Sequence, residues 1–345
     1  MSRWRTFGIF LALAVGATLL AGTLSRVPLD KIWAALRSVA LWQFGIFLLV
    51  SLLNLTLQVT RWRMLLRAQN VRLPFRRLLE IRLAAFAMTY LTPLADLLGE
   101  GVRAYLLSRE NVRPPLALAA AASDRLIEWT THIALTLLVL AAAAASGALP
   151  FQRPTLLIAL AAVISLVILV GAHLAAGRRV LGPFFRMLRI SNLKTLKNTA
   201  RSIDRFEDIL ADYLVEKRPV LGRAMLLSSL ISAITFVEVW LVVSFLGYQP
   251  TLTEIVIVQT MLIAVYAVPG VANVGVGDLS GAAIFGALGM DAVRGVAFAF
   301  VVRAKDLLIA GAGLASLLWL LKGNVPLLSH FLTSWLSQKN HGSTS

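Results

Sequence analysis

The sequence contains no cysteine and only four histidines, so the usual ligands and nucleophiles of redox and metal proteins are scarce. The absence of cysteine excludes disulfides, thiolate catalysis, iron–sulfur clusters and cysteine-based zinc sites. The histidines lie too far apart along the chain to form a short metal-binding motif. We therefore expect neither a metal site nor a cofactor.

Charged residues are also scarce, at 14% of 345 residues, where a typical soluble domain has about 25%. Hydrophobic residues make up 58% of the chain and form runs long enough to cross a bilayer. The sequence thus predicts an all-α, polytopic membrane protein. A net charge of +16 would suggest a nucleic-acid partner for a soluble protein, but here we expect it to reflect membrane topology and expect no nucleic-acid partner.

Six apolar stretches are long enough for spanning helices, at residues 7–24, 40–59, 115–145, 155–175, 221–246 and 296–321. The first exceeds the apolar region of a cleaved signal peptide, so we expect it to be retained as a helix. Two more apolar segments, 83–107 and 255–290, are interrupted by proline, glycine and charged residues. Each is interpreted as a re-entrant hairpin of two half-length helices, which requires a buried or wet break.

The distribution of Lys and Arg predicts the orientation of these helices. The predicted topology places 24 of them on one side of the membrane and 5 on the other. By the positive-inside rule, the richer side and both termini are cytoplasmic, in the cell's inner (cytoplasmic) membrane. We expect one transmembrane domain over residues 1–325, with a cytoplasmic linker at about 178–220 and a cytoplasmic tail at 326–345. Within the linker, about 191–218 is a candidate amphipathic helix on anionic headgroups.

The two halves of the chain share a motif of acid, base and acid. The spacing is 25 residues and then three in both copies, Glu100, Arg125 and Glu128 in the first and Asp278, Arg303 and Asp306 in the second. The predicted topology inverts the first repeat, at about 40–145, relative to the second, at about 221–321. Inverted repeats are typical of secondary transporters, in which broken helices meet at a midplane site. Chance similarity between Ala/Leu-rich helices is the alternative.

Each charge inside a membrane costs about 2.5–3.5 kcal/mol on insertion scales, so each needs a partner or a wet cavity. Within each motif the arginine and the following acid lie one helical turn apart and can form an ion pair. One interpretation is that these pairs only hold helices together. In the other, Glu100 and Asp278 face the arginines across a central cavity, where the arginines bind a phosphate and the acids release it by competition or by carrying a proton.

Arg103, one turn after Glu100, extends the candidate substrate site. A second set of polar residues near the membrane interior supports it: Asp96, Asp124, His132, Glu238 and Lys305. His132 is either a structural histidine or a residue that couples transport to protons. The run Arg61-Trp62-Arg63 is interpreted as an interfacial anchor where a helix leaves the membrane.

Several short motifs occur in one order along the chain: Arg61-Trp62-Arg63 with Leu65-Leu66, Leu91-Thr92-Pro93 to Gly99-Glu100 with Arg103, Arg125, and Pro269-Gly270 to Gly277-Asp278 with Arg303. Over about residues 5–325 this pattern resembles the transmembrane, flippase-like region of lysylphosphatidylglycerol synthases and related stand-alone membrane proteins. The resemblance implies a helical protein that moves a lipid headgroup between leaflets. Asp278 lies farther from Pro269 than the corresponding acid in the family pattern. No aminoacyl-transfer domain follows residue 325, so we expect no lipid aminoacylation.

We expect a flippase or transporter for a phosphate-bearing lipid, of the phospholipid or polyprenyl-phosphate type, and not an enzyme. No P-loop occurs in the chain, so we expect transport without ATP hydrolysis, driven by a gradient of protons or another ion or by simple equilibration. The expected partner is a membrane lipid with an anionic headgroup. Two alternatives stay open: an integral-membrane enzyme that uses Glu100 or Asp278 as acid or base, and a secondary transporter of a small soluble anion.

Overall fold

The computed structural model describes residues 29–92, 95–145, 208–209, 212, 216–266 and 276–321, and every regular element in this part of the chain is a helix. The helices are α2 (Leu29–Ser38), α3 (Leu41–Ala68), α4 (Phe75–Leu91), α5 (Ala95–Ser108), α6 (Pro114–Ala145), α10 (Arg218–Phe245), α11 (Leu252–Tyr266), α12 (Val276–Ala287) and α13 (Ala292–Leu321). This confirms the predicted all-α class.

Four of these helices, α3, α6, α10 and α13, are long and apolar enough to cross a membrane. They have 28 to 32 residues each, and they confirm the predicted spans at 40–59, 115–145, 221–246 and 296–321. The chain is therefore a multi-pass membrane protein. The predicted spans at 7–24 and 155–175, most of the linker at 178–220 and the tail at 326–345 lie outside the described residues.

The interrupted segments form pairs of short helices, as predicted. Between α4 and α5, Thr92 has an extended backbone with φ −120° and ψ 146°, the conformation that a following proline imposes on the residue before it. Helices α11 and α12 have 15 and 12 residues, and the break between them lies outside the described residues. The sequence did not predict α2, which packs against α13 by burying Ile32 against Val296.

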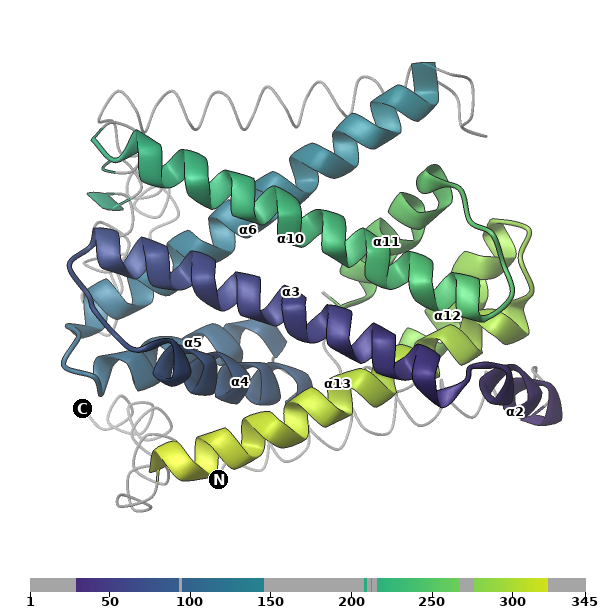
Figure 1. Ribbon diagram of the computed structural model, residues 1–345, viewed down its shortest axis with the longest axis horizontal. Helices are drawn as coiled ribbons and strands as arrows, with labels where there is room; N and C mark the ends of the chain where they lie inside the picture. Colours follow the sequence, from purple (N-terminus) through teal and green to yellow (C-terminus); the bar gives the residue numbers. More distant parts are fainter. Residues whose placement is uncertain are drawn as a thin grey trace, which may run out of the picture.

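The two pairs of short helices pack at opposite ends of the long helices (Figure 1). The α4–α5 pair shares a core with Trp62 in the C-terminal half of α3 and with Leu320 at the end of α13. The α11–α12 pair shares a core with Phe47 in the N-terminal half of α3 and with Phe298 near the start of α13. Each short-helix pair is thus enclosed by one end of the bundle.

Each half of the chain packs one of its short helices against a long helix of the other half. Helix α4 of the first half lies along α13 of the second, and α11 of the second half contacts α6 of the first. The α4–α13 contact is close because Gly313 has no side chain: a Cβ there would collide with the backbone oxygen of Leu83. Gly281 and Gly295 allow a similar approach of α12 to α13. Such small residues let membrane helices pack backbone to backbone.

Candidate functional site

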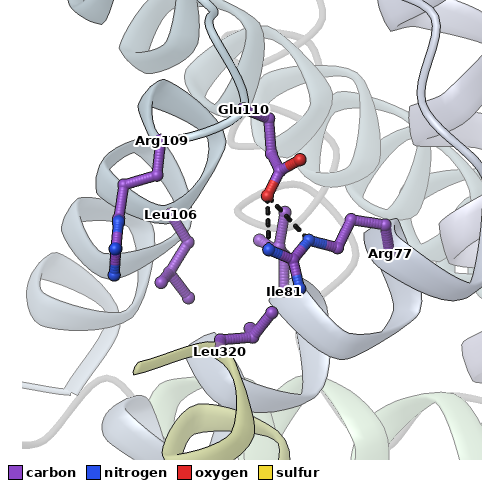
Figure 2. Close-up of a pocket in the computed structure, with 6 residues that line it drawn as sticks. All are labelled: Arg77, Ile81, Leu106, Arg109, Glu110 and Leu320. Carbon is purple, nitrogen blue, oxygen red and sulfur yellow. Dashed lines mark hydrogen bonds and ion pairs between the residues drawn. The ribbon is translucent and has the colours of Figure 1, made fainter. Parts of the chain in front are cut away.

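A cleft of about 90 Å³ lies where the start of α4 meets the ends of α5 and α13 (Figure 2). Arg77 and Arg109 give it cationic walls, together with Glu110. Both Glu110, at 2.6 Å, and Glu80, at 3.3 Å, form ion pairs with Arg77. Because two carboxylates already hold Arg77, this side of the cleft offers an anion little unused positive charge.

The main charged cluster is centred on Asp124 of α6, whose side chain is fully buried. Three arginines from three other helices surround its carboxylate. Arg61 Nε of α3 lies 2.9 Å from Oδ1, whereas Arg82 Nη1 of α4 and Arg103 Nη2 of α5 lie 3.2 and 2.6 Å from Oδ2. One carboxylate thus joins α3, α4, α5 and α6.

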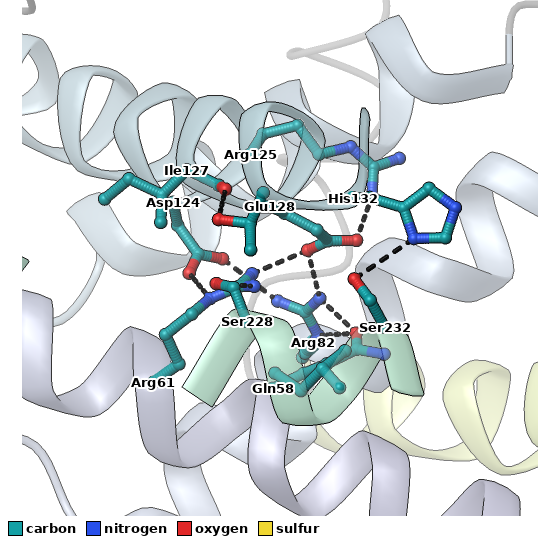
Figure 3. A network of polar contacts seen from close by, with 12 residues as sticks. Gln58, Arg61, Arg82, Asp124, Arg125, Ile127, Glu128, His132, Ser228 and Ser232 are labelled. Carbon is teal, nitrogen blue, oxygen red and sulfur yellow. Dashed lines mark hydrogen bonds and ion pairs between the residues drawn. The ribbon is translucent and has the colours of Figure 1, made fainter. Parts of the chain in front are cut away.

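Glu128 lies one helical turn further along α6 and extends the cluster (Figure 3). Its Oε2 accepts from Arg61 Nη2 at 2.6 Å and from Arg82 Nη2 at 3.5 Å. Its Oε1 accepts from Arg125 Nη1 at 3.4 Å, which confirms the predicted pair one turn apart. Glu128 is therefore shared by three arginines.

Glu100 and Arg125 form the accessible rim of this cluster, each with 27% of its side chain exposed. Glu100 Oε1 lies 3.7 Å from Arg125 Nε, and Oε2 lies 3.3 Å from Arg103 Nη1. The predicted acid and base, 25 residues apart in the sequence, are thus in contact. Arg125 also lies over the ring of Trp129, with 5.6 Å from Cζ to the ring centroid.

We call this set the arginine cluster: Arg61, Arg82, Arg103, Arg125, Glu100, Asp124 and Glu128. These described residues comprise four arginines and three acids. An anionic ligand could pair with the guanidinium at the accessible rim.

The second half of the chain has its own ion pair at the same spacing. Arg303 Nη2 of α13 donates to Asp278 Oδ2 of α12 at 2.9 Å, and the Asp278 side chain is fully buried. The pair corresponds to Glu100 and Arg125 of the first half, so the repeated spacing does predict a repeated contact.

A further group of charges surrounds Lys305 on α13. Its Nζ lies 3.2 Å from Asp306 Oδ1 and 3.6 Å from Glu238 Oε2 of α10. Glu238 Oε1 accepts a hydrogen bond from Asn54 Nδ2 of α3 at 3.0 Å. We call Glu238, Lys305 and Asp306 the lysine triad.

His132 of α6 faces α10 beside the arginine cluster. Its Nδ1 lies 3.1 Å from Ser232 Oγ, and its ring lies 5.5 Å from that of Phe236, centroid to centroid. Its buried Nε2 has no hydrogen-bond partner among the described residues. The side chain of Asp96, which was also predicted to support the site, lies outside the described part.

Comparison with known proteins identifies the family. The family profile described as "Lysylphosphatidylglycerol synthase TM region" matches residues 9–313. The chain belongs to this family. No curated protein and no solved structure matched the chain. Membership of the lysylphosphatidylglycerol synthase TM-region family connects this membrane protein with the handling of lipids.

In this family member, the interpretation of Arg61 and Trp62 as an interfacial anchor is wrong. Both side chains are fully buried, and the guanidinium of Arg103 lies over the Trp62 ring at 3.9 Å from its centroid. Helix α3 continues to Ala68, well beyond the predicted end at residue 59, so these residues lie inside the bundle. A tryptophan between arginines late in an apolar stretch gives the same local sequence pattern at a membrane interface and in the interior of a helix bundle.

Sequence reasoning also missed Arg82 and gave Asp124 only a supporting role. Arg82 immediately precedes the interrupted segment predicted at 83–107, but it lies in α4 and is 9% exposed. The sequence of α3 does contain one sign of a polar interior contact. Asn54, Gln58 and Arg61 are separated by four and then three residues. This spacing places polar groups on one face of a helix and indicates a polar interior contact.

Among the described residues, no group of three or more His, Asp or Glu side chains has the arrangement of a metal site. The arginine cluster instead offers guanidinium groups held in place by carboxylates. Guanidinium groups bind phosphate and carboxylate oxygens in a bidentate manner, so the chemistry suits an oxyanion.

Proposed function

We propose that this protein is a flippase or transporter that moves a phosphate-bearing lipid, of the phospholipid or polyprenyl-phosphate type, between leaflets. The observation that carries the proposal is the rim of the arginine cluster. There Arg125 combines a partly exposed guanidinium with a cluster that has four arginines and three acids. An incoming phosphate could pair with this guanidinium in a bidentate manner.

Release of the phosphate follows from the way the acids are shared. Glu100 and Glu128 both contact Arg125, and each also contacts a second arginine, Arg103 or Arg61. A phosphate that takes Arg125 would leave each acid with another cation, so no carboxylate would become isolated. Return of the acids to Arg125 would then displace the lipid. Competition for one guanidinium thus provides binding and release without ATP hydrolysis.

We further propose that the two halves are inverted repeats with re-entrant hairpins. Three observations support this: the short-helix pairs pack at opposite ends of the bundle, the halves pack in a crossed manner, and the pairs Glu100–Arg125 and Asp278–Arg303 share one spacing. In transporters such halves rock about a midplane site. We place the protein in the inner membrane with both termini in the cytoplasm.

Transport fits the geometry better than chemistry on the headgroup. The contact between Ser232 and His132 is one that a hydrolytic enzyme could use, since histidine can activate a serine. Such a base is normally held by a third group. The second nitrogen of His132 has no partner among the described residues, so the orienting group is not supplied there.

The proposal is tested by comparing two transport reactions in proteoliposomes of the purified full chain. One follows the transbilayer movement of a fluorescent phosphatidylglycerol by its reduction with external dithionite, and the other follows uptake of radiolabelled inorganic phosphate. A lipid flippase accelerates only the first reaction. Acceleration of phosphate uptake alone would instead favour a transporter of small anions.

Native lipids that co-purify with the protein identify the substrate class by mass spectrometry. We expect phosphate-bearing lipids to be enriched with the wild type and depleted with Arg125→Lys, which keeps the charge but loses the planar fork. Arg76→Gln is the matched control, because Arg76 is 83% exposed and lies outside the arginine cluster. Equal lipid content in all three proteins would argue against the proposed site.

A further inference from the structure

The arginine cluster and the lysine triad are joined by two neutral side chains of α3, Asn54 and Gln58. Gln58 Oε1 accepts from Arg82 Nε at 3.1 Å and also from Arg82 Nη2. Gln58 Nε2 donates to Asn54 Oδ1 at 2.8 Å. Asn54 Nδ2 donates to Glu238 Oε1 at 3.0 Å, so the hydrogen bonds form one unbroken chain.

The two ends of this chain determine its direction. Arg82 has only donor groups, so Gln58 must turn its carbonyl oxygen toward it and its amide NH₂ toward Asn54. Asn54 must then turn its own NH₂ toward Glu238, whose carboxylate accepts. Reversal of either amide would set two donors or two acceptors against each other. The chain therefore runs from a cation to an anion in one sense only.

Asn54 lies in the interior of the bundle, and Gln58 beside it is partly buried. Asn54 is 5% exposed and also donates to Thr235 Oγ1 at 3.0 Å. Thr235 in turn donates to the backbone oxygen of Ile231, so its lone pairs remain directed at Asn54. Hydrogen bonds polarise one another in a medium of low dielectric constant, so a change of charge at one end is felt at the other.

Resting on the proposed lipid transport, we propose that Asn54 and Gln58 are positioning residues that transmit the protonation state of Glu238 to the arginine cluster. While Glu238 is a carboxylate, the chain holds Arg82 toward Gln58. Protonation weakens the bond from Asn54, because hydrogen bonds to a charged acceptor are roughly twice as strong as those to a neutral one. The hold of Gln58 on Arg82 weakens with it.

Arg82 acts on the lipid site through Glu128, which it approaches at 3.5 Å. Once released from Gln58, Arg82 turns further toward Glu128 and competes with Arg125 for that carboxylate. Arg125, at the accessible rim, is then held less tightly by Glu128 and can turn its Nη1 to a phosphate. Proton uptake at Glu238 thus favours binding of the lipid headgroup, which couples lipid transport to a proton.

The charged and polar groups that face Glu238 come from α3 and α13. Asn54 lies on α3, and Lys305 with Asp306 lies on α13. Lys305 and Asp306 compensate each other, at 3.2 Å, when Glu238 becomes neutral. Loss of the Glu238 charge therefore leaves no isolated lysine.

The test is a double-mutant cycle on the full chain, with flux of fluorescent phosphatidylglycerol in proteoliposomes measured between pH 5 and 8. At pH 8, Glu238→Gln should change the flux about fivefold, the effect of about 1 kcal/mol of coupling. In the background of Gln58→Met the same substitution should change it less than about twofold. Asn54→Leu interrupts the chain at a second point and should flatten the pH profile as Gln58→Met does.

Thr56→Val is the matched control, since Thr56 is exposed on α3 and bonds only to its own helix. Its pH profile should match the wild type. The proposal is overturned if Glu238→Gln has the same fold effect in both backgrounds, or if the profiles of Gln58→Met and Asn54→Leu match that of Thr56→Val.

A wild type that moves no lipid would refute the proposed function but not this coupling. The cycle is then read from unfolding midpoints in detergent. A midpoint shift for Glu238→Gln that differs between the wild-type and Gln58→Met backgrounds supports the hydrogen-bonded link, and equal shifts refute it.

Discussion

Replacing Asp124 by asparagine removes one negative charge from the centre of the arginine cluster while leaving the side-chain volume almost unchanged. The Asp124 carboxylate accepts from Arg61, Arg82 and Arg103 at 2.9, 3.2 and 2.6 Å, and it is fully buried. Asparagine keeps one oxygen but turns an NH₂ donor toward arginines that can only donate. The variant also leaves three closely placed arginines without the negative charge between them.

The expected loss of stability follows from these contacts. At least one hydrogen bond to a charged group is lost, and such a bond contributes about 1.5–3 kcal/mol. The retained bonds keep an arginine donor but lose the charge of the acceptor, so they weaken as well. Removal of one partner of a buried ion pair costs about 3–5 kcal/mol in comparable cases. We expect Asp124→Asn to lower the free energy of unfolding by about 3–5 kcal/mol.

The assay is equilibrium unfolding of the purified protein in mixed micelles, followed by far-ultraviolet circular dichroism. Glu80→Gln provides the control. Glu80 pairs with the exposed Arg76 and with Arg77, which keeps Glu110 as a partner, so the loss of this charge should cost less than about 1 kcal/mol. Adding Arg82→Gln to Asp124→Asn restores the net charge and should recover part of the stability. If Asp124→Asn has the same free energy of unfolding as the control variant, the cluster does not hold the four helices together.

Two further predictions concern topology and the acids at the breaks. Cysteines can be introduced one at a time at Arg113, Gln249 and Asp291 of the cysteine-free chain and labelled with an impermeant maleimide. The cysteine at 113 should react from the cytoplasm, and those at 249 and 291 should react from outside. Labelling of all three from the same side would refute the inverted repeats. Glu100→Gln and Asp278→Asn mimic protonated acids, so each, added to Glu238→Gln, should remove the pH dependence of lipid flux that remains in that variant between pH 5 and 8, while lipid binding is retained. An unchanged profile in both variants would make these acids structural.

The long helices and the motif contacts could be predicted because both depend on local or repeated features of the sequence. The length of an apolar run is enough to indicate a spanning helix, and Pro93 is enough to indicate a break. The common spacing of 25 residues led to the pairs Glu100–Arg125 and Asp278–Arg303, which the structure shows in contact.

The centre of the arginine cluster could not be predicted in the same way. Arg61 and Arg82 belong to the interior only because α3, α4, α5 and α6 meet around Asp124. That meeting depends on packing between segments up to 63 residues apart, and no local pattern reports it. An arginine near the end of an apolar stretch looks the same whether it faces a headgroup or a buried carboxylate.

The most direct test of the account is the flux of fluorescent phosphatidylglycerol through proteoliposomes that contain the wild type, Arg125→Lys or Arg76→Gln. Lysine at position 125 keeps the charge without the bidentate fork, so we expect the rate to fall about tenfold or more, the effect of losing about 1.4 kcal/mol of headgroup binding. Arg76→Gln should keep the wild-type rate, because Arg76 is exposed and outside the cluster. Wild-type flux in Arg125→Lys, or flux no faster than in empty liposomes for the wild type, would contradict the account.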